Sequence, residues 1–474
     1  MNAIAHADIP EWLLPAAAQA GPAGRLRLAE IVGALSYALD LTEGQPPGHC
    51  LRCCWIGMHI GQMVGLDAEA LGDLYYTLLL KDTGCSSNAA RLWELYGGDE
   101  LLTKRDFKLV DSQSLLQLGR FVLRHAGPGE ALRERLKRLL NLYRNGETLA
   151  TELVHTRCER GADIVRRLGF GATVAAGIFS LDEHWNGHGR PQGLRGAEIP
   201  LNARIALLAQ VIDVFNTVGG ERAACTEVHR RVGTWFDPQL CQAFFAVARG
   251  ARFWSGLGAE GLEGRIWALE PAASTILIDE PRLDSIAEAF ADIIDAKSNF
   301  TYGHSQRVAR YAERIGRELG MCAARRRWLH RGALLHDIGK LGVSNSILEK
   351  PGHLDGPEWD AVKQHAQLTE NILQRVRIFG ELAPIAGAHH ERIDGMGYPK
   401  RLRGAAIPLE TRIITTADIF DAISAERPYR GAVPVPRTLE MMAATVGTAL
   451  DAACFEALKV VAAGVEGAEG PGRP

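Results

Sequence analysis

The sequence predicts an all-α protein built from two tandem helical bundles, and three observations lead to this fold class. Apolar residues recur at the spacing of an amphipathic helix in segments such as 283–297 and 358–376. Period-two alternation of β-branched residues is almost absent, and residues 273–280 are the best strand candidate, or else a lead into a helix. The chain has 474 residues, more than the roughly 250–300 at which one hydrophobic core stops growing.

An internal repeat orders the chain. Each copy has a Gly-His pair and, 32 residues beyond its histidine, a pair that ends in aspartate: Gly48-His49 with Lys81-Asp82, and Gly303-His304 with His336-Asp337. Residues 186–215 also parallel residues 394–423 without a gap. Two copies of one domain are the economical explanation of such self-similarity.

We therefore expect five segments along the chain. They are a flexible N-terminus (1–24), the first copy (25–250), a connector (251–282), the second copy (283–464) and a flexible tail (465–474). The first copy is longer because residues 90–150 have no counterpart in the second. Within that insertion, Gly97 to Leu101 spell GGDEL, which we interpret as a helix start.

Composition limits the function classes. Hydrophobic residues make up 47% and charged residues 23%, as in folded soluble domains. The net charge of −3 gives no reason to expect a nucleic-acid polymer or a membrane as partner. Nine scattered cysteines indicate reduced thiols, and no run of about 18 apolar residues or basic leader is present, so we expect a cytoplasmic location.

The second copy contains a candidate metal centre. Its imidazoles and carboxylates are ligands that suit divalent first-row metals, and a helical bundle can bring them together from several helices. Five imidazoles and two carboxylates exceed what one metal takes, so two metals are expected: His304, His336, Asp337, His365, His389, His390 and Asp418. A lone buried histidine is more often a core residue, and we assign His330 and His353 to that class.

The second copy resembles the HD-GYP domain, a bacterial branch of the HD phosphohydrolase superfamily. The matching motifs are GHSxRV (303–308), LLHDIGKLG (334–342), His365, HHERIDGMGYP (389–399), IPLETRI (407–413), TADIFDAI (416–423) and RPYR (427–430). The resemblance implies one metal held by His304, His336, Asp337 and Asp418. Asp337 would bridge to a second metal held by His365, His389 and His390, and iron or manganese is the usual occupant.

The resemblance also implies a reaction, the hydrolysis of cyclic di-GMP to pGpG or GMP. Two metals lower the pKa of a bridging water and clamp an in-line displacement, so no protein nucleophile is needed. We expect catalytic roles for Asp337 and Lys340, and substrate contacts from Lys340, Tyr398, Arg412 and Arg430. The alternative for Tyr398 is a loop cap that touches no ligand.

The resemblance bears on partners and on metal number as well. Diguanylate cyclase proteins of the GGDEF type are an expected partner through the loop that contains Tyr398, and a homodimer is another. Family members with three metals have a glutamate where this chain has Phe300, so a third metal is not expected.

The first copy has lost most of these ligands. It keeps His49, Asp82 and His155, but the other positions have become Lys81, Leu181, Asp182 and Gln210. We expect a non-catalytic domain in which Lys81 either repels a dication or replaces it as a salt-bridge partner. A single-metal site at His49, Asp82, His155 and His184 is the alternative.

Two other functions stay open at this point. An HD phosphohydrolase could act on another cyclic nucleotide, because no motif identifies the residues that read the base. A non-catalytic cyclic di-GMP signalling module is the third reading, although the complete ligand set argues against it. The run Arg325 to Arg327 is expected to be a solvated helix face.

Overall fold

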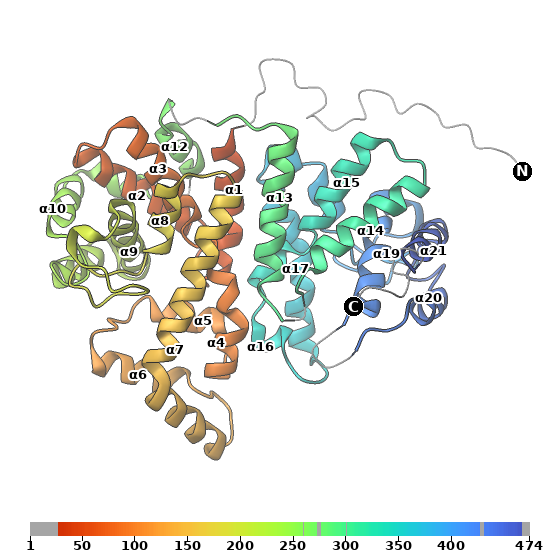
Figure 1. Ribbon diagram of the computed structural model, residues 1–474, viewed down its shortest axis with the longest axis horizontal. Coiled ribbons are helices and arrows are strands. Elements are labelled where there is room, and N and C mark those ends of the chain that lie inside the picture. Colours follow the sequence, from red (N-terminus) through yellow and green to blue (C-terminus); the bar gives the residue numbers. More distant parts are fainter. Residues whose placement is uncertain (1–26, 259, 273–275, 300, 427–430, 467–474) are drawn as a thin grey trace, which may run out of the picture.

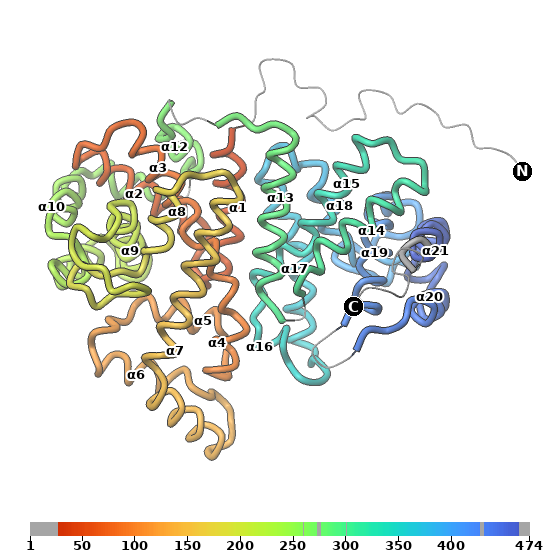
Figure 2. Tube along the Cα trace, in the orientation of Figure 1, coloured from red at the N-terminus to blue at the C-terminus, as the bar shows by residue number. Residues whose placement is uncertain are grey.

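The computed structural model describes residues 27–258, 260–272, 276–299, 301–426 and 431–466. Every named element in these ranges is helical, which confirms the all-α class; the extended pairings in them are three isolated bridges. Figure 1 shows two groups of helices side by side, and the colours of Figure 2 show that each group is one contiguous half of the sequence. We call these groups the first half and the second half.

The first half runs from α1 to α12. Its elements are α1 (Leu28–Thr42), α2 (His49–Met63), α3 (Ala68–Leu80), η3 (Cys85–Asn88), α4 (Ala89–Tyr96), α5 (Glu100–Phe107), α6 (Leu115–His125), α7 (Leu132–Arg167), α8 (Ala172–Phe179), η4 (Gly196–Glu198), α9 (Leu201–Arg231), α10 (Pro238–Val247), α11 (Ala251–Ser255) and α12 (Leu262–Leu269). The insertion at 90–150 thus forms most of α4, then α5, α6 and the first part of α7. Phe253 and Ile266, in the expected connector, are buried in the core.

The second half runs from α13 to α21. Its elements are α13 (Glu280–Asp295), α14 (His304–Glu318), α15 (Ala323–Leu335), η6 (Ile338–Gly342), α16 (Asn345–Leu348), α17 (Gly356–Gln374), η7 (Arg377–Phe379), α18 (Leu382–Ala386), η8 (Gly404–Ala406), α19 (Leu409–Ser424), α20 (Val435–Ala443) and α21 (Ala452–Glu466). The strand candidate at 273–280 lies partly outside the described residues. Its described part makes one bridge, between Leu277 and Arg27, and Asp279 then caps α13.

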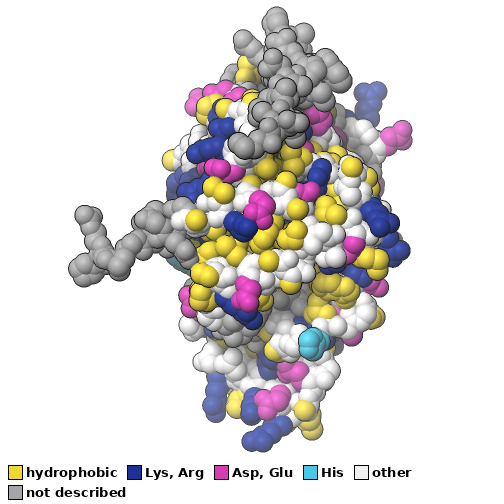
Figure 3. Space-filling view, turned by 90° about the vertical axis from the view of Figure 1, so that its right-hand side faces the viewer, with side chains coloured by type: hydrophobic (Ala, Val, Ile, Leu, Met, Phe, Trp, Pro, Cys, Tyr) yellow, Lys and Arg dark blue, Asp and Glu magenta, His cyan; other side chains and the backbone are white. Residues whose placement is uncertain are grey.

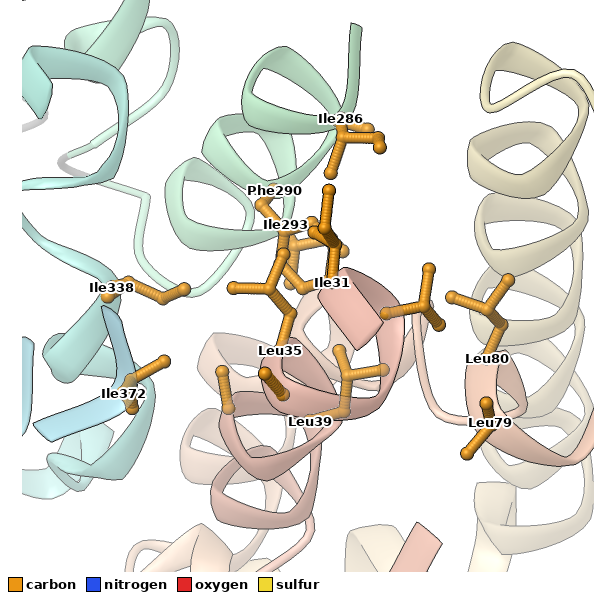
Figure 4. Close-up of a cluster of buried hydrophobic side chains, with 14 of the residues drawn as sticks. Ile31, Leu35, Leu39, Leu79, Leu80, Ile286, Phe290, Ile293, Ile338 and Ile372 are labelled. Carbon is orange, nitrogen blue, oxygen red and sulfur yellow. The ribbon is translucent and has the colours of Figure 1, made fainter. Parts of the chain in front are cut away.

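One hydrophobic core continues across the junction of the two halves. Figure 4 shows Ile31, Leu35 and Leu39 of α1 with Phe290 of α13 and Ile338 of η6 on one side and Leu79 and Leu80 of α3 on the other. These side chains are fully buried. The helix that opens the first half therefore supports η6, the short helix that follows His336-Asp337 in the second half.

A buried ion pair also joins the halves. Glu100, at the start of α5, binds the Lys297 ammonium (2.7 Å), the Ser344 hydroxyl (2.8 Å) and the Asn345 N–H (2.8 Å). Both charged side chains are at most 1% exposed. Asp99 caps the same helix through the Leu101 N–H, so the GGDEL sequence is a helix start, as expected. The insertion thus anchors the loop beyond η6.

The face of the second half that Figure 3 shows has mixed charge, and the apolar helix α9 is largely packed inside the bundle. On the side of the second half farthest from the first, Figure 3 shows acidic and basic side chains interspersed with apolar ones. Among the described residues, α9 is long and apolar enough to cross a membrane, but 67% of its apolar window is buried in the bundle. Gly220, with φ of 70°, interrupts that helix.

Candidate metal centre

Two glycines position the first histidines of the site. Gly303 precedes α14 with φ of 66°, a conformation that favours glycine, and His304 is the first residue of the helix. α15 ends at Leu335, so His336 and Asp337 lie at the turn into η6. A Cβ on Gly339 would lie 2.0 Å from the His365 carbonyl oxygen. Glycine therefore lets η6 approach α17, the helix that contributes His365.

The predicted ligands converge on the Asp337 carboxylate. Its Oδ1 lies 3.5 Å from the Nε2 atoms of both His365 and His389, and its Oδ2 lies 3.4 Å from Nε2 of His336. His304 Nε2 lies 3.8 Å from Asp337 Oδ2 and 3.2 Å from Asp418 Oδ1. His390 has a ring nitrogen within 4.8 Å of ring nitrogens of His365 and His389. All seven predicted ligands are thus in one cluster.

The hydrogen bonds of the rings leave the Nε2 atoms as acceptors. The Nδ1–H of His336 donates to the Ala333 carbonyl (2.7 Å) and that of His389 to the Ala386 carbonyl (2.7 Å); His365 bonds the Val362 carbonyl in the same way. A ring that donates from Nδ1 presents a lone pair at Nε2. The Nε2 atoms of His365 and His389 nevertheless lie 3.3 Å apart. Because both rings donate from Nδ1, neither Nε2 has a hydrogen to donate to the other.

Two buried atoms of the cluster remain unpaired, although the Lys340 ammonium binds the other oxygen of Asp337. His336 Nε2 and Asp337 Oδ1 have no hydrogen-bond partner, although both are inaccessible to solvent. Unpaired buried polar atoms are costly, and a cation among them removes that cost. The donor set of imidazole and carboxylate suits a divalent first-row metal, so the residues present fit such an ion.

Burial keeps most of these imidazoles neutral. It lowers the pKa of His336 to about 4 and that of His365 to about 3, which leaves both able to bind a metal at neutral pH. Burial also opposes protonation of His304, but hydrogen bonds to Asp418 and Asp421 raise its pKa to about 9. His304 thus differs from His336 and His365 in the hydrogen bonds that its ring makes to carboxylates.

Sequence reasoning missed two carboxylates that hold the ligands in place. Asp421 accepts from His304 Nδ1 (2.7 Å) and Arg307 Nε (2.6 Å), and Asp295 accepts from the Ser305 hydroxyl (2.7 Å). Such outer partners fix ring orientation and ligand basicity. The repeat contained a signal for Asp421, because its equivalent, Asp213, is retained while the Asp418 position has become Gln210.

The four predicted substrate contacts are placed differently. Lys340 lies 2.5 Å from Asp337 Oδ2, and the Tyr398 ring lies 4.8 Å from the ring of His390, so both border the cluster. Arg412 instead binds Asp451 (2.8 Å) and the Ile407 carbonyl (3.0 Å). Arg430 and Phe300 lie outside the described residues.

The equivalent pair in the first half explains the position of Arg412. Arg204 binds Asp237 at 2.7 Å, as Arg412 binds Asp451, in a half that lacks most ligands. Because the Arg–Asp pair is present in the first half, where most of the metal ligands are lost, it favours a structural role for Arg412. In the run Arg325 to Arg327, none of the side chains is buried, and each guanidinium binds a carboxylate: Glu410, Glu313 and Asp284 respectively.

Lysines occupy the corresponding cluster of the first half. The Lys81 ammonium contacts His49 Nε2 (3.1 Å), Gln210 Oε1 (3.1 Å) and the Asp82 carboxylate. Lys108, from the insertion, also approaches Gln210 at 3.3 Å. Both lysines are nearly inaccessible to solvent. Of the two outcomes expected for Lys81, the geometry corresponds to a salt-bridge partner in the place of a metal.

The alternative four-residue site of the first half is not assembled. His155 is half exposed on α7 and faces Glu159, while His184 stacks on Trp235 at 3.9 Å between ring centroids. Two other groups have ligand atoms within 4.8 Å of one another, His49 with Cys53 and Asp213, and Glu43 with Asp82 and Cys85. Their carboxylates already bind Arg52, Lys81 or Lys108.

Comparisons with known proteins agree with this architecture. The family model for the HD domain matches residues 137–240 and 288–454. A 3′3′-cGAMP-specific phosphodiesterase 3 of Vibrio cholerae is 52% identical over 432 residues, which cover 91% of this chain and 94% of that protein. The crystal structure of the cyclic GMP-AMP-specific phosphodiesterase V-cGAP3 of V. cholerae matches with a TM-score of 0.65 at 48% identity, covering 93% of this chain and 99% of that one.

A more distant relative matches a smaller part of the chain. The cyclic di-GMP phosphodiesterase response regulator RpfG of Xanthomonas campestris is 34% identical over 204 residues, 42% of this chain and 54% of that protein. The relatives thus include proteins that are named for two different cyclic dinucleotides.

Proposed function

The chain belongs to the HD domain family, among relatives that are phosphodiesterases of the HD-GYP type, and from this premise we propose that it is a metal-dependent phosphodiesterase that hydrolyses a cyclic dinucleotide. One observation carries the proposal. The Nε2 atoms of His336, His365 and His389 converge on Asp337, and two of the atoms in this buried cluster have no partner. Such a set of imidazole and carboxylate donors fits divalent cations.

Relatedness favours 3′3′-cGAMP as the substrate over the cyclic di-GMP that the motifs predict. The relative named for 3′3′-cGAMP matches almost the whole chain at 52% identity, whereas RpfG, named for cyclic di-GMP, matches less than half at 34%. Cyclic di-GMP stays the second candidate. The motifs could not separate the two, because they contain metal ligands and few residues that reach a base.

We propose two metal ions, with iron or manganese as the occupants, held by the seven predicted ligands. Bound metals would supply a nucleophile at neutral pH and stabilise charge on the phosphoryl oxygens. Asp337 would help to hold both ions, because its Oδ2 faces His336 and its Oδ1 faces His365. Asp421 orients the ring of His304, and Lys340 brings a positive charge beside Asp337 where substrate phosphate would bind.

The first half has a different role in this proposal. We assign residues 25–250 to a non-catalytic HD-like domain and residues 283–464 to the catalytic domain. Lys81 and Lys108 supply positive charge where metals would otherwise be needed, and α1 and Glu100 support the catalytic half through packing and hydrogen bonds. A synthase partner at the Tyr398 loop, a homodimer and a cytoplasmic location stay predictions.

Turnover of defined substrates tests the proposal. The full chain is purified anaerobically and loaded with Mn²⁺ or Fe²⁺, and 3′3′-cGAMP and cyclic di-GMP are assayed separately, with products separated by chromatography. We expect hydrolysis of at least one, with a higher kcat/KM for 3′3′-cGAMP, and loss of turnover in Asp337→Ala. A fully metal-loaded protein that cleaves neither compound would overturn the proposal.

A further inference from the structure

A row of aromatic rings leads from the metal ligands to the surface. The Tyr398 ring is tilted against His390 at 4.8 Å, and the Trp359 ring meets Tyr398 edge to face at 6.3 Å. Trp359 lies in the first turns of α17, six residues before the ligand His365, and is 44% exposed. Tryptophan side chains usually stabilise a fold by being buried, and an indole as exposed as this one contributes much less of that stabilisation.

The surroundings of Trp359 are those of a stacking platform. Lys363, one turn along α17, has its Nζ 5.8 Å from the indole centroid and is held there by Asp360 at 3.0 Å. A cation over a tryptophan ring restrains the ring and adds positive charge beside it. Met396, two residues before Tyr398, is 78% exposed.

The internal repeat provides a comparison within the chain. Counting back from the aligned histidines His155 and His365, the position of Trp359 is Leu149 in the first half, and that of Tyr398 is Arg190. The first half has therefore lost both rings together with the ligands. If the two rings had a purely structural role, we would expect the first half to keep them even though it has lost the metal ligands.

We propose that Trp359 and Tyr398 form a nucleobase subsite that stacks one purine of the cyclic dinucleotide. This inference rests on the proposed function. In such a substrate each base is one sugar away from the phosphate that is cleaved, and the rings extend outward from His390 over two successive contacts of 4.8 and 6.3 Å. Stacking on an aromatic ring accepts any base, so the subsite supports affinity without separating guanine from adenine.

Steady-state kinetics of the metal-loaded full chain test the subsite. Trp359→Ala raises KM for 3′3′-cGAMP and for cyclic di-GMP alike, by between about 5-fold and about 150-fold, the range for loss of a base-stacking aromatic. The value of kcat changes by less than about threefold, because Trp359 does not touch the ligands. Trp359→Phe, which keeps an aromatic face, loses less than Trp359→Ala.

Inorganic phosphate is the control ligand, because it offers the metal centre phosphoryl oxygens like those of the substrate and has no base. Its inhibition constant stays the same in Trp359→Ala. A KM within about twofold of wild type would overturn the subsite, and so would an equal rise in the inhibition constant of phosphate, which would show a disturbed metal centre. Failure of the proposed function is distinguishable, because the wild type itself would then cleave no cyclic dinucleotide.

Binding measured by fluorescence is independent of turnover. Cyclic dinucleotide binding quenches part of the tryptophan emission of the wild type, and Trp359→Phe loses this quench. Trp254→Phe, whose indole bonds the Ala248 carbonyl in the first half, keeps it. A full quench in Trp359→Phe would contradict stacking on this ring.

Discussion

The Asp421 carboxylate offers the sharpest test of how the metal centre is held together. It is 1% exposed and binds His304 Nδ1 at 2.7 Å and Arg307 Nε at 2.6 Å. Asp421→Asn keeps the shape but removes the charge that orients the ring and raises its basicity. Loss of such a partner typically costs 10–100-fold in metal affinity, or about 1.4–2.8 kcal/mol.

The internal repeat provides a matched control for this variant. Asp213 in the first half makes the same contacts, with His49 Nδ1 at 2.7 Å and Arg52 Nε at 2.6 Å, and is equally buried. Asp213→Asn therefore removes the same hydrogen-bonded charge from the same local structure. It should lower the free energy of unfolding by a similar amount and leave metal affinity unchanged.

The assay is a titration of the metal-free full chain with Mn²⁺ in a chelator buffer, with hydrolysis measured on the same samples. Asp421→Asn should shift the metal titration to 10–100-fold higher free Mn²⁺, and Asp213→Asn should not shift it. Equal shifts in the two variants would refute the reasoning, because the effect would then come from general destabilisation. Absence of a shift in Asp421→Asn would refute it as well.

Three further predictions concern charges in and around the first half. Glu100→Gln leaves the Lys297 ammonium buried without its anion, so the free energy of unfolding in urea should fall by about 3–5 kcal/mol and recover in Glu100→Gln/Lys297→Met; a loss below about 1 kcal/mol would contradict this. Lys81→Met should destabilise similarly by leaving the buried Asp82 carboxylate without its cation, with unchanged metal content by elemental analysis; a loss below about 1 kcal/mol would refute its role as a cation substitute. Burial raises the pKa of Asp40 to about 6 from 3.8, so the contribution of Asp40 to stability falls as pH rises between about 4 and 6, and the difference in free energy of unfolding between wild type and Asp40→Asn should shift toward the variant over that window and then level off; a pH-independent difference would contradict the raised pKa.

The fold and most of the cluster follow from local patterns in the sequence. Helical periodicity and the absence of strand alternation are properties of single segments, and the structure confirms the helical class they predict. The spacing of 32 residues between His304 and His336 corresponds to one helical hairpin, so two ligands meet wherever α14 and α15 pack side by side. The seven candidate ligands do lie together.

The motifs could not predict contacts between side chains that lie far apart in the sequence. Glu100 is 197 positions from Lys297, and no pattern around either residue points to the other. Arg412 sits in a family motif, but whether its guanidinium faces substrate or Asp451 depends on where α21 begins. The role of Asp421 could be predicted only by comparing the two copies. The first copy keeps the equivalent Asp213 but has lost the ligand position at Gln210, which indicates a structural role for this aspartate.

Anomalous diffraction from crystals of the Mn²⁺-loaded full chain tests the central claim most directly. We predict two peaks about 3.5–4 Å apart, both within ligand distance of the Asp337 carboxylate. The first half should show none beside Asp82, where the Lys81 ammonium lies. A single peak that Asp337 does not touch, or a metal bound between His49 and Asp82, would contradict the account.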